Sequence, residues 1–141
     1  SRFTIATHML IIIAIKSQES KVTSDFLAAS VGVNPVIIRK TLSQLKKAEL
    51  ISVARGTGGT EIIKDLQDIS LFDIYQAVEC LGKSGKLFSF HDNPNPKCPV
   101  GANIHEVLDQ KLLDIQLAME NQLRQTSLAQ VVADAEARIV K

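Results

Sequence analysis

The sequence predicts a mainly α-helical fold with a small β-hairpin: a winged helix-turn-helix followed by a long C-terminal dimerisation helix. Three observations predict it. Two helical segments joined by a glycine turn lie within residues 24–48, and a β-prone, glycine-rich stretch follows at 50–63. A further segment, about 100–124, keeps a helical apolar period. We therefore expect a winged helix-turn-helix domain at 1–81, a connecting loop at 82–99, and the dimerisation and C-terminal helices at 100–141.

The first helical segment, 3–15, is apolar on every side in its second half. Because such a helix must be covered on more than one side, we expect it in the core. A helix shared with a partner chain and a buried strand are the alternatives. Its apolar run, 9–15, is far shorter than the roughly 18 residues that cross a bilayer, and no secretory signal pattern precedes it. We expect a soluble cytoplasmic protein that does not bind membranes.

The next two helices have marked ends and a specific spacing. The first begins at 23 or 24, and the second begins after Asn34 and runs to about 48. Ala28, Gly32 and Ile38 stand at positions 5, 9 and 15 of a helix-turn-helix pattern. The small Ala lets the helices cross closely, the Gly adopts the left-handed turn, and the apolar residue joins the pair. A plain αα-hairpin is the alternative.

The outward side of the second helix is basic. Residues 26–48 hold four Lys and Arg and no acidic residue. A helix fits the DNA major groove, where Lys, Arg, Gln and Ser contact base edges or phosphates. A solvated basic face is the alternative, although such faces usually mix charge signs. The residues expected to contact DNA are Asn34, Val36, Arg39, Lys40, Ser43, Gln44 and Lys47.

Two β-prone stretches, 50–53 and 60–63, flank a glycine-rich turn and predict a hairpin wing. An arginine at the tip could enter the minor groove or bind a phosphate. A structural turn with an incidental arginine is the alternative. At the wing and at the start of the chain, the expected DNA contacts are Arg55, Gly56, Gly58, Gly59 and, on a phosphate, Arg2.

The long helix has two apolar sides. One side can pack within its own chain, whereas Leu113 and Leu117 on the polar back need another partner. We therefore expect a homodimer, in which two recognition helices lie about one DNA turn apart. A helix buried within a monomer is the alternative. The main apolar stripe consists of Ile104, Val107, Leu108, Leu112, Ile115, Met119 and Leu123.

The formal net charge of +1 is unevenly distributed. Residues 26–60 hold five basic residues and one acidic residue, whereas 99–141 hold four basic and six acidic residues. The basic part is favourable for binding DNA. The sequence contains no nucleophile–base set, metal motif or phosphate loop that would indicate an enzyme. The rival interpretation is a winged-helix protein-interaction module that binds an acidic partner.

Several motifs resemble the Rrf-two family of bacterial transcriptional regulators, which includes IscR, NsrR and CymR, and the overall pattern is most similar to its YwnA-like members. The resemblance implies a homodimeric winged-helix repressor or activator that binds partly palindromic double-stranded operator DNA. The resemblance covers nearly the whole chain. The matching segments are SRF at 1–3, NPV at 34–36, LKKAELI at 45–51, VARGTGG at 53–59, DIYQAVE at 73–79 and CPV at 98–100.

The sequence departs from the family at its cluster site and its wing. Well-known members hold an iron–sulfur cluster on three cysteines, but only Cys98 matches, with Asp92 and Lys86 at the other positions. We therefore expect no cofactor; an unusual metal site at His91, Asp92 and Cys98 is the residual alternative. Thr60 replaces the usual Tyr after the wing glycines.

The cysteines and the connecting loop are the expected sensing region. Cys98 precedes the long helix, a position that favours a reactive thiolate, so we expect redox sensing there. An inert remnant of the cluster site is the alternative, and an unknown small-molecule or protein effector remains open. Cys80 is expected to be a packing residue.

Overall fold

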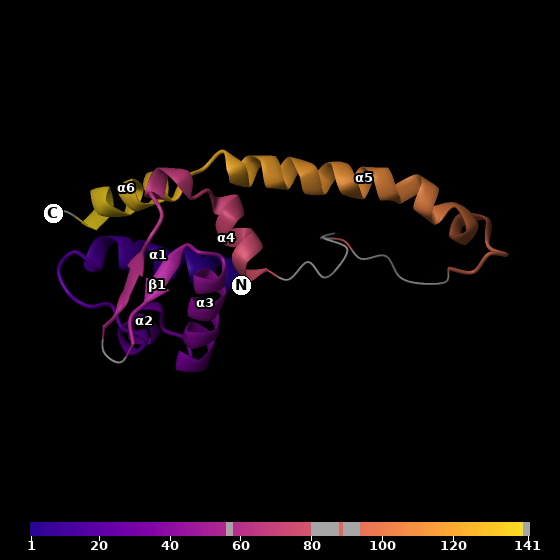
Figure 1. Cartoon of the computed structure of the whole chain (residues 1–141). Helices are drawn as coiled ribbons and strands as arrows, with labels where there is room; N and C mark the ends of the chain where they lie inside the picture. The colour runs from indigo at the N-terminus through magenta and orange to yellow at the C-terminus, as the bar shows by residue number, and fades with distance from the viewer. Residues whose placement is uncertain (56–57, 80–87, 89–93, 140–141) are drawn as a thin grey trace. The chain divides into compact units, whose positions relative to one another are not determined.

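The computed structural model describes residues 1–55, 58–79, 88 and 94–139 (Figure 1). The expected fold class is confirmed: the described chain is mainly helical with one two-stranded antiparallel sheet. The elements in chain order are α1 (Arg2–Lys16), α2 (Ser24–Val31), α3 (Pro35–Lys47), β1 (Ile51–Val53), β2 (Thr60–Ile62), the short 3-10 helix η1 (Leu66–Asp68), α4 (Leu71–Val78), α5 (Pro99–Arg124) and α6 (Leu128–Ile139).

The chain divides into two compact units. The first comprises Ser1–Glu79 with Leu123–Lys141, and the second comprises Cys80–Gln122. This division differs from the boundaries expected at 81 and 99, because α6 belongs to the first unit. Residues that the sequence singles out but that lie outside the described part are Gly56, Cys80, Lys86, His91 and Asp92.

Helix α1 is the central helix of the first unit. It contacts α2, α3, α4, α6 and β2, so the prediction of a core helix is confirmed and the strand alternative is wrong. The Ser1 hydroxyl caps it by accepting a 3.3 Å hydrogen bond from the backbone N–H of Thr4. Its fully buried side chains are Ala6, Met9, Leu10 and Ile13.

Helices α2 and α3 form the predicted helix-turn-helix. The Thr23 hydroxyl caps α2, and Gly32 ends it with a φ of +79°, the left-handed conformation that glycine adopts without a steric penalty. Ala28 and Ile38 are both buried, and the two helices contact each other. The spacing that predicted the motif therefore corresponds to the residues that pack the pair together.

The wing is joined to the segment that precedes α2. Strands β1 and β2 pair antiparallel, with Val53 opposite Thr60, and the Thr60 N–H donates a 2.9 Å hydrogen bond to the Val22 carbonyl. Gly59 has a φ of +84°, and a Cβ there would lie 3.1 Å from the Val22 backbone nitrogen. Both the φ and the close approach require glycine, so Gly59 has a structural role in the wing.

The starts of α4 and α6 are linked by two backbone hydrogen bonds. Ser70 and Asp73 form a capping box at the start of α4, a pattern of two residues three positions apart. The Leu71 N–H donates to the Thr126 carbonyl at 2.9 Å, and the Leu128 N–H donates to the Ile69 carbonyl at 2.7 Å. These reciprocal bonds attach the start of α6 to the first unit.

Helix α5 makes up most of the described part of the second unit. The side-chain amide of Gln116 donates to the Glu120 carboxylate at 2.9 Å, and both residues are buried. In the described part of the chain, no helix is long and apolar enough to cross a membrane. The large apolar side chains that α5 exposes are Val100, Val107, Leu113, Ile115 and Leu117.

Candidate nucleic-acid interface

Helix α3 separates its buried and exposed residues onto opposite sides. With about 100° between successive residues, the two sets lie across the helix from each other. The buried set is Ile38, Thr41, Leu42 and Leu45. The opposite stripe, which we call the outer stripe, consists of Val36, Lys40, Ser43 and Lys47, all of them exposed. Arg39 and Lys46 flank the outer stripe and are exposed as well.

The basic side chains near this surface form no ion pair with an acidic side chain in the described part of the chain. Ion pairs among the described residues join Lys16 to Glu19 and His105 to Asp109. No described acidic group forms an ion pair with the basic residues of α3 or the wing. Their charge is therefore available to an anionic partner such as the phosphate backbone of DNA. The residues concerned are Arg39, Lys40, Lys46, Lys47 and Arg55.

Asn34 is engaged in the start of the recognition helix. Its Oδ1 accepts a 2.8 Å hydrogen bond from the backbone N–H of Val36, and Pro35 occupies the first turn. The cap fixes where α3 begins and holds Val36 in place. Asn34 is exposed at this end of the helix, so its amide nitrogen is the group best placed to meet a base or phosphate.

Gln44 is less accessible than the other predicted DNA-contacting residues of α3. It is half-buried, and its Oε1 is buried without a hydrogen-bond partner in the described part of the chain. Its position on α3 is next to the half-exposed Ile37 rather than within the outer stripe. From this position Gln44 would reach a base only from the side of α3 and not from the outer stripe.

At the wing, Arg55 and Gly58 are exposed. A Cβ at Gly58 would collide with the Cβ of Ala54, so the turn admits no side chain there. The structure thus separates the wing residues into a charged one that can contact DNA and two glycines that shape the turn, Gly58 and Gly59. Arg2 is exposed in the first turn of α1.

Cys98 lies in the second unit, immediately before α5, and is exposed. Backbone N–H groups of Gly101 and, to a smaller extent, Val100 lower the pKa of its thiol, because they donate to the sulfur and favour the thiolate. The first turn of α5 also packs closely on the preceding turn: a Cβ at Gly101 would lie 2.6 Å from the Asn95 carbonyl oxygen. The local structure therefore supports an accessible, acidified thiol.

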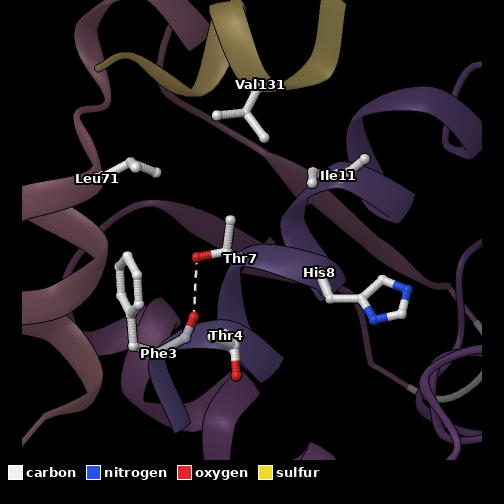
Figure 2. A pocket seen from close by; sticks show the side chains of 7 residues that line it. All are labelled: Phe3, Thr4, Thr7, His8, Ile11, Leu71 and Val131. Carbon is white, nitrogen blue, oxygen red and sulfur yellow. Dashed lines mark hydrogen bonds between the residues drawn. The ribbon is translucent and has the colours of Figure 1, made fainter. Parts of the chain in front are cut away.

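The first unit contains an apolar cleft that the sequence did not predict. It has a volume of about 370 Å³, and Figure 2 shows that its lining comes from α1, α4 and α6. The Thr7 hydroxyl donates to the Phe3 carbonyl at 2.8 Å, and the His8 imidazole lies at the edge. The only local signal was a histidine on an apolar helix. The lining residues are Phe3, Thr4, Thr7, His8, Ile11, Leu71 and Val131.

A helix-turn-helix with an exposed basic recognition helix, followed by a two-stranded wing, defines a winged-helix DNA-binding protein. The sequence profile of the Rrf2 (Rrf-two) family, described as "Iron-dependent Transcriptional regulator", matches residues 1–134. The chain belongs to this family. It is a DNA-binding transcription regulator and not an enzyme, as its sequence predicts.

Individual relatives agree with this assignment. The "Putative HTH-type transcriptional regulator YwnA" of Bacillus subtilis (strain 168) is 43% identical over 132 residues, which cover 94% of this chain and 95% of that protein. A solved structure described as "Crystal structure of a putative DNA binding protein" is 39% identical with a TM-score of 0.74, over 93% of this chain and 98% of that one. IscR of T. potens shares the fold, with a TM-score of 0.72 at 20% identity over 100% and 90% of the two chains.

The residues of this chain do not fit the iron–sulfur cluster of well-known family members. A cluster depends on several thiolate ligands, and the sequence contains two cysteines. Among the described residues, no group of three His, Cys, Asp or Glu side chains is arranged to hold a metal ion. Two cysteines are too few for a cluster site built from three thiolates.

Proposed function

We propose that this chain binds double-stranded operator DNA as a homodimer and represses the adjacent genes from the cytoplasm. The observation that carries this proposal is the outer stripe of α3, which is exposed, flanked by unneutralised cations and directly opposite the buried side of the helix. A helix in this state presents side chains to the major groove while its own core contacts hold it in position.

The proposed contacts follow from position on α3, the wing and α1. Val36, Lys40, Ser43 and Lys47 enter the groove, and Arg39 contacts its edge. Asn34 and Gln44 contribute through their amide groups from the end and the flank of the helix. Arg55 and the wing glycines, Gly56, Gly58 and Gly59, approach the neighbouring backbone or minor groove, and Arg2 contacts a phosphate.

Dimerisation through α5 is supported by its exposed apolar side chains. Val107 and Ile115 are 50% and 54% exposed on the predicted stripe, and Leu113 and Leu117 are 42% and 44% exposed on the other side. Leaving several large apolar side chains on one helix in water is unfavourable, and a second copy would cover them. Two copies would then meet two half-sites of a partly palindromic operator.

The signal that controls DNA binding is proposed to act through the Cys98 thiol. Its exposure and its lowered pKa favour reaction with oxidants or electrophiles. The alternative is a small-molecule or protein effector. The cleft lined by Phe3, Leu71 and Val131 favours an apolar molecule, because its wall is apolar. Measuring the DNA binding of the wild type and of Cys98→Ser after exposure to peroxide separates the thiol mechanism from the effector mechanism. If the thiol is the sensor, peroxide changes the DNA binding of the wild type and not that of Cys98→Ser.

The central experiment selects DNA from a random duplex pool with the full-length chain and measures affinity between 50 and 200 mM salt. We expect sequence-specific binding whose affinity falls steeply with salt concentration. Lys40→Ala should bind the same DNA with lower affinity and with a smaller dependence on salt. Arg138→Ala is the matched control, because it removes an exposed cation from α6. If the chain selects no duplex but binds polyglutamate, the alternative interpretation holds: a winged-helix protein-interaction module that binds an acidic partner.

A further inference from the structure

Val36 is the one apolar side chain in the outer stripe of α3. It is 60% exposed, whereas the other three members of the stripe are polar or basic. It lies directly across the helix from the buried side, so no residue of its own helix-turn-helix covers it. A single exposed apolar residue is ordinary on a protein surface, but this one lies at the N-terminal end of the helix that is proposed to enter the major groove, where recognition helices contact base edges.

The geometry around Val36 holds it rigidly. Its backbone N–H donates to Asn34 Oδ1 at 2.8 Å, and Pro35 fixes the preceding residue in the first helical turn. A valine in a helix has one strongly preferred rotamer, because its Cβ is branched. Both the backbone and the side chain of Val36 are therefore set before DNA arrives, and binding costs little side-chain entropy.

The chemistry of base edges determines what such a residue can recognise. In the major groove, guanine, adenine and cytosine present hydrogen-bonding groups, whereas thymine alone adds a C5 methyl group. A rigid isopropyl group cannot hydrogen-bond, so it gains only by covering that methyl. Lys40, one turn further along the outer stripe, supplies the charge that holds the helix in the groove.

We propose that Val36 recognises the C5 methyl group of one thymine in each operator half-site. This inference rests on the proposed function and adds to it the identity of one base. Opposite Val36, cytosine, adenine or guanine would place hydrogen-bonding groups against an apolar surface and leave them without partners. Val36 is thus a specificity-determining residue, and its contact is independent of phosphate neutralisation.

The test uses a duplex that the full-length chain has selected from a random pool. Each thymine is replaced in turn by uracil, which removes only the methyl group, and binding is measured for the wild type and for Val36→Ala. Because Val36 is exposed, the variant keeps the core of α3 intact. Ile139→Ala is the control, since it shortens an exposed apolar side chain on α6.

We expect one thymine per half-site at which uracil weakens wild-type binding about fourfold, the amount expected for one buried methyl group. In Val36→Ala this ratio falls towards one, while the control keeps the wild-type ratio. Uracil tolerated at every position, or a ratio that Val36→Ala leaves unchanged, would overturn the inference and leave the proposed function standing. Failure to select any duplex would overturn the proposed function and this inference with it.

Discussion

The backbone N–H of Phe3, in the first turn of α1, donates a 3.0 Å hydrogen bond to Oε1 of Glu79, which follows the last turn of α4. The start of a helix leaves four N–H groups without partners in the helix and carries a partial positive charge. Ser1 satisfies one of them through Thr4, and Glu79 satisfies another with a carboxylate. The contact of the Phe3 ring with Tyr75, edge to face at 5.9 Å between ring centres, joins the same two helices.

This bond predicts a loss of stability when the carboxylate is removed. Glu79→Ala should lower the free energy of unfolding by about 1–2 kcal/mol, since it deletes a part-buried, charge-assisted hydrogen bond. Glu79→Gln should lose less, because its amide oxygen still accepts from Phe3. Urea denaturation of the two variants measures the difference. Equal losses in both would show that the charge at the helix start, rather than the hydrogen bond, is what stabilises α1.

A second stability prediction concerns the residue that follows the recognition helix. Glu49 has a φ of +64°, the left-handed conformation that is unfavourable for residues with a Cβ. Glu49→Gly should therefore raise the free energy of unfolding by about 1 kcal/mol. The adjacent Ala48 has a φ of −80°, so Ala48→Gly should instead destabilise by about 1 kcal/mol. Thermal unfolding should show shifts of opposite sign, and shifts of the same sign would refute the strain at Glu49.

The elements that short sequence patterns define were predictable, and the contacts between distant segments were not. The cap at Asn34, the left-handed Gly32 and the box of Ser70 with Asp73 depend on neighbours within a few residues. By contrast, Phe3 and Glu79 are 76 residues apart, and nothing in a local pattern pairs them. The membership of α6 in the first unit likewise depends on backbone bonds to Ile69 and Leu71.

The candidate nucleic-acid interface, too, was only partly predictable from the sequence. The exposure of Lys40, Ser43 and Lys47 follows from the helical period of the apolar residues, so the outer stripe was predictable. The partial burial of Gln44 depends on side-chain packing that periodicity does not resolve. The cleft near His8 combines three helices and could not be assembled from any one of them.

Arg55 should contribute to DNA affinity through charge. Arg55→Ala should weaken binding to the selected duplex about tenfold and reduce the slope of log K against log salt by about one, as expected for one lost phosphate contact. Arg138→Ala, an exposed cation on α6, is the control. Fluorescence anisotropy across a salt series measures both quantities. Undiminished binding by Arg55→Ala would remove the wing from the proposed interface.

Cys98 should react as a thiolate at a lower pH than a free cysteine. Because N–H groups of Gly101 and Val100 lower its pKa, a larger fraction is ionised at any pH below that pKa. In a Cys80→Ser background, the rate of alkylation by iodoacetamide should therefore reach its plateau at lower pH. Gly101→Ala should move the profile back to higher pH, because its Cβ would collide with the Asn95 carbonyl and displace the turn. A profile like that of free cysteine would exclude the acidified thiol.

The exposed apolar side chains of α5 predict a dimer that one charge can break. Ile115 is 54% exposed on the predicted stripe, and burying a glutamate there between two copies would leave two like charges without solvent. Ile115→Glu should therefore be monomeric at micromolar concentration in sedimentation equilibrium, whereas the wild type is dimeric. Gln130→Glu adds the same charge at an exposed position on α6 and should stay dimeric. Loss of the dimer should also weaken DNA binding by far more than the loss of any single cation, because each copy would then hold one half-site alone. A monomeric wild type would mean that α5 does not form a dimer, and a dimeric Ile115→Glu would exclude the side of α5 that holds Ile115 from the interface.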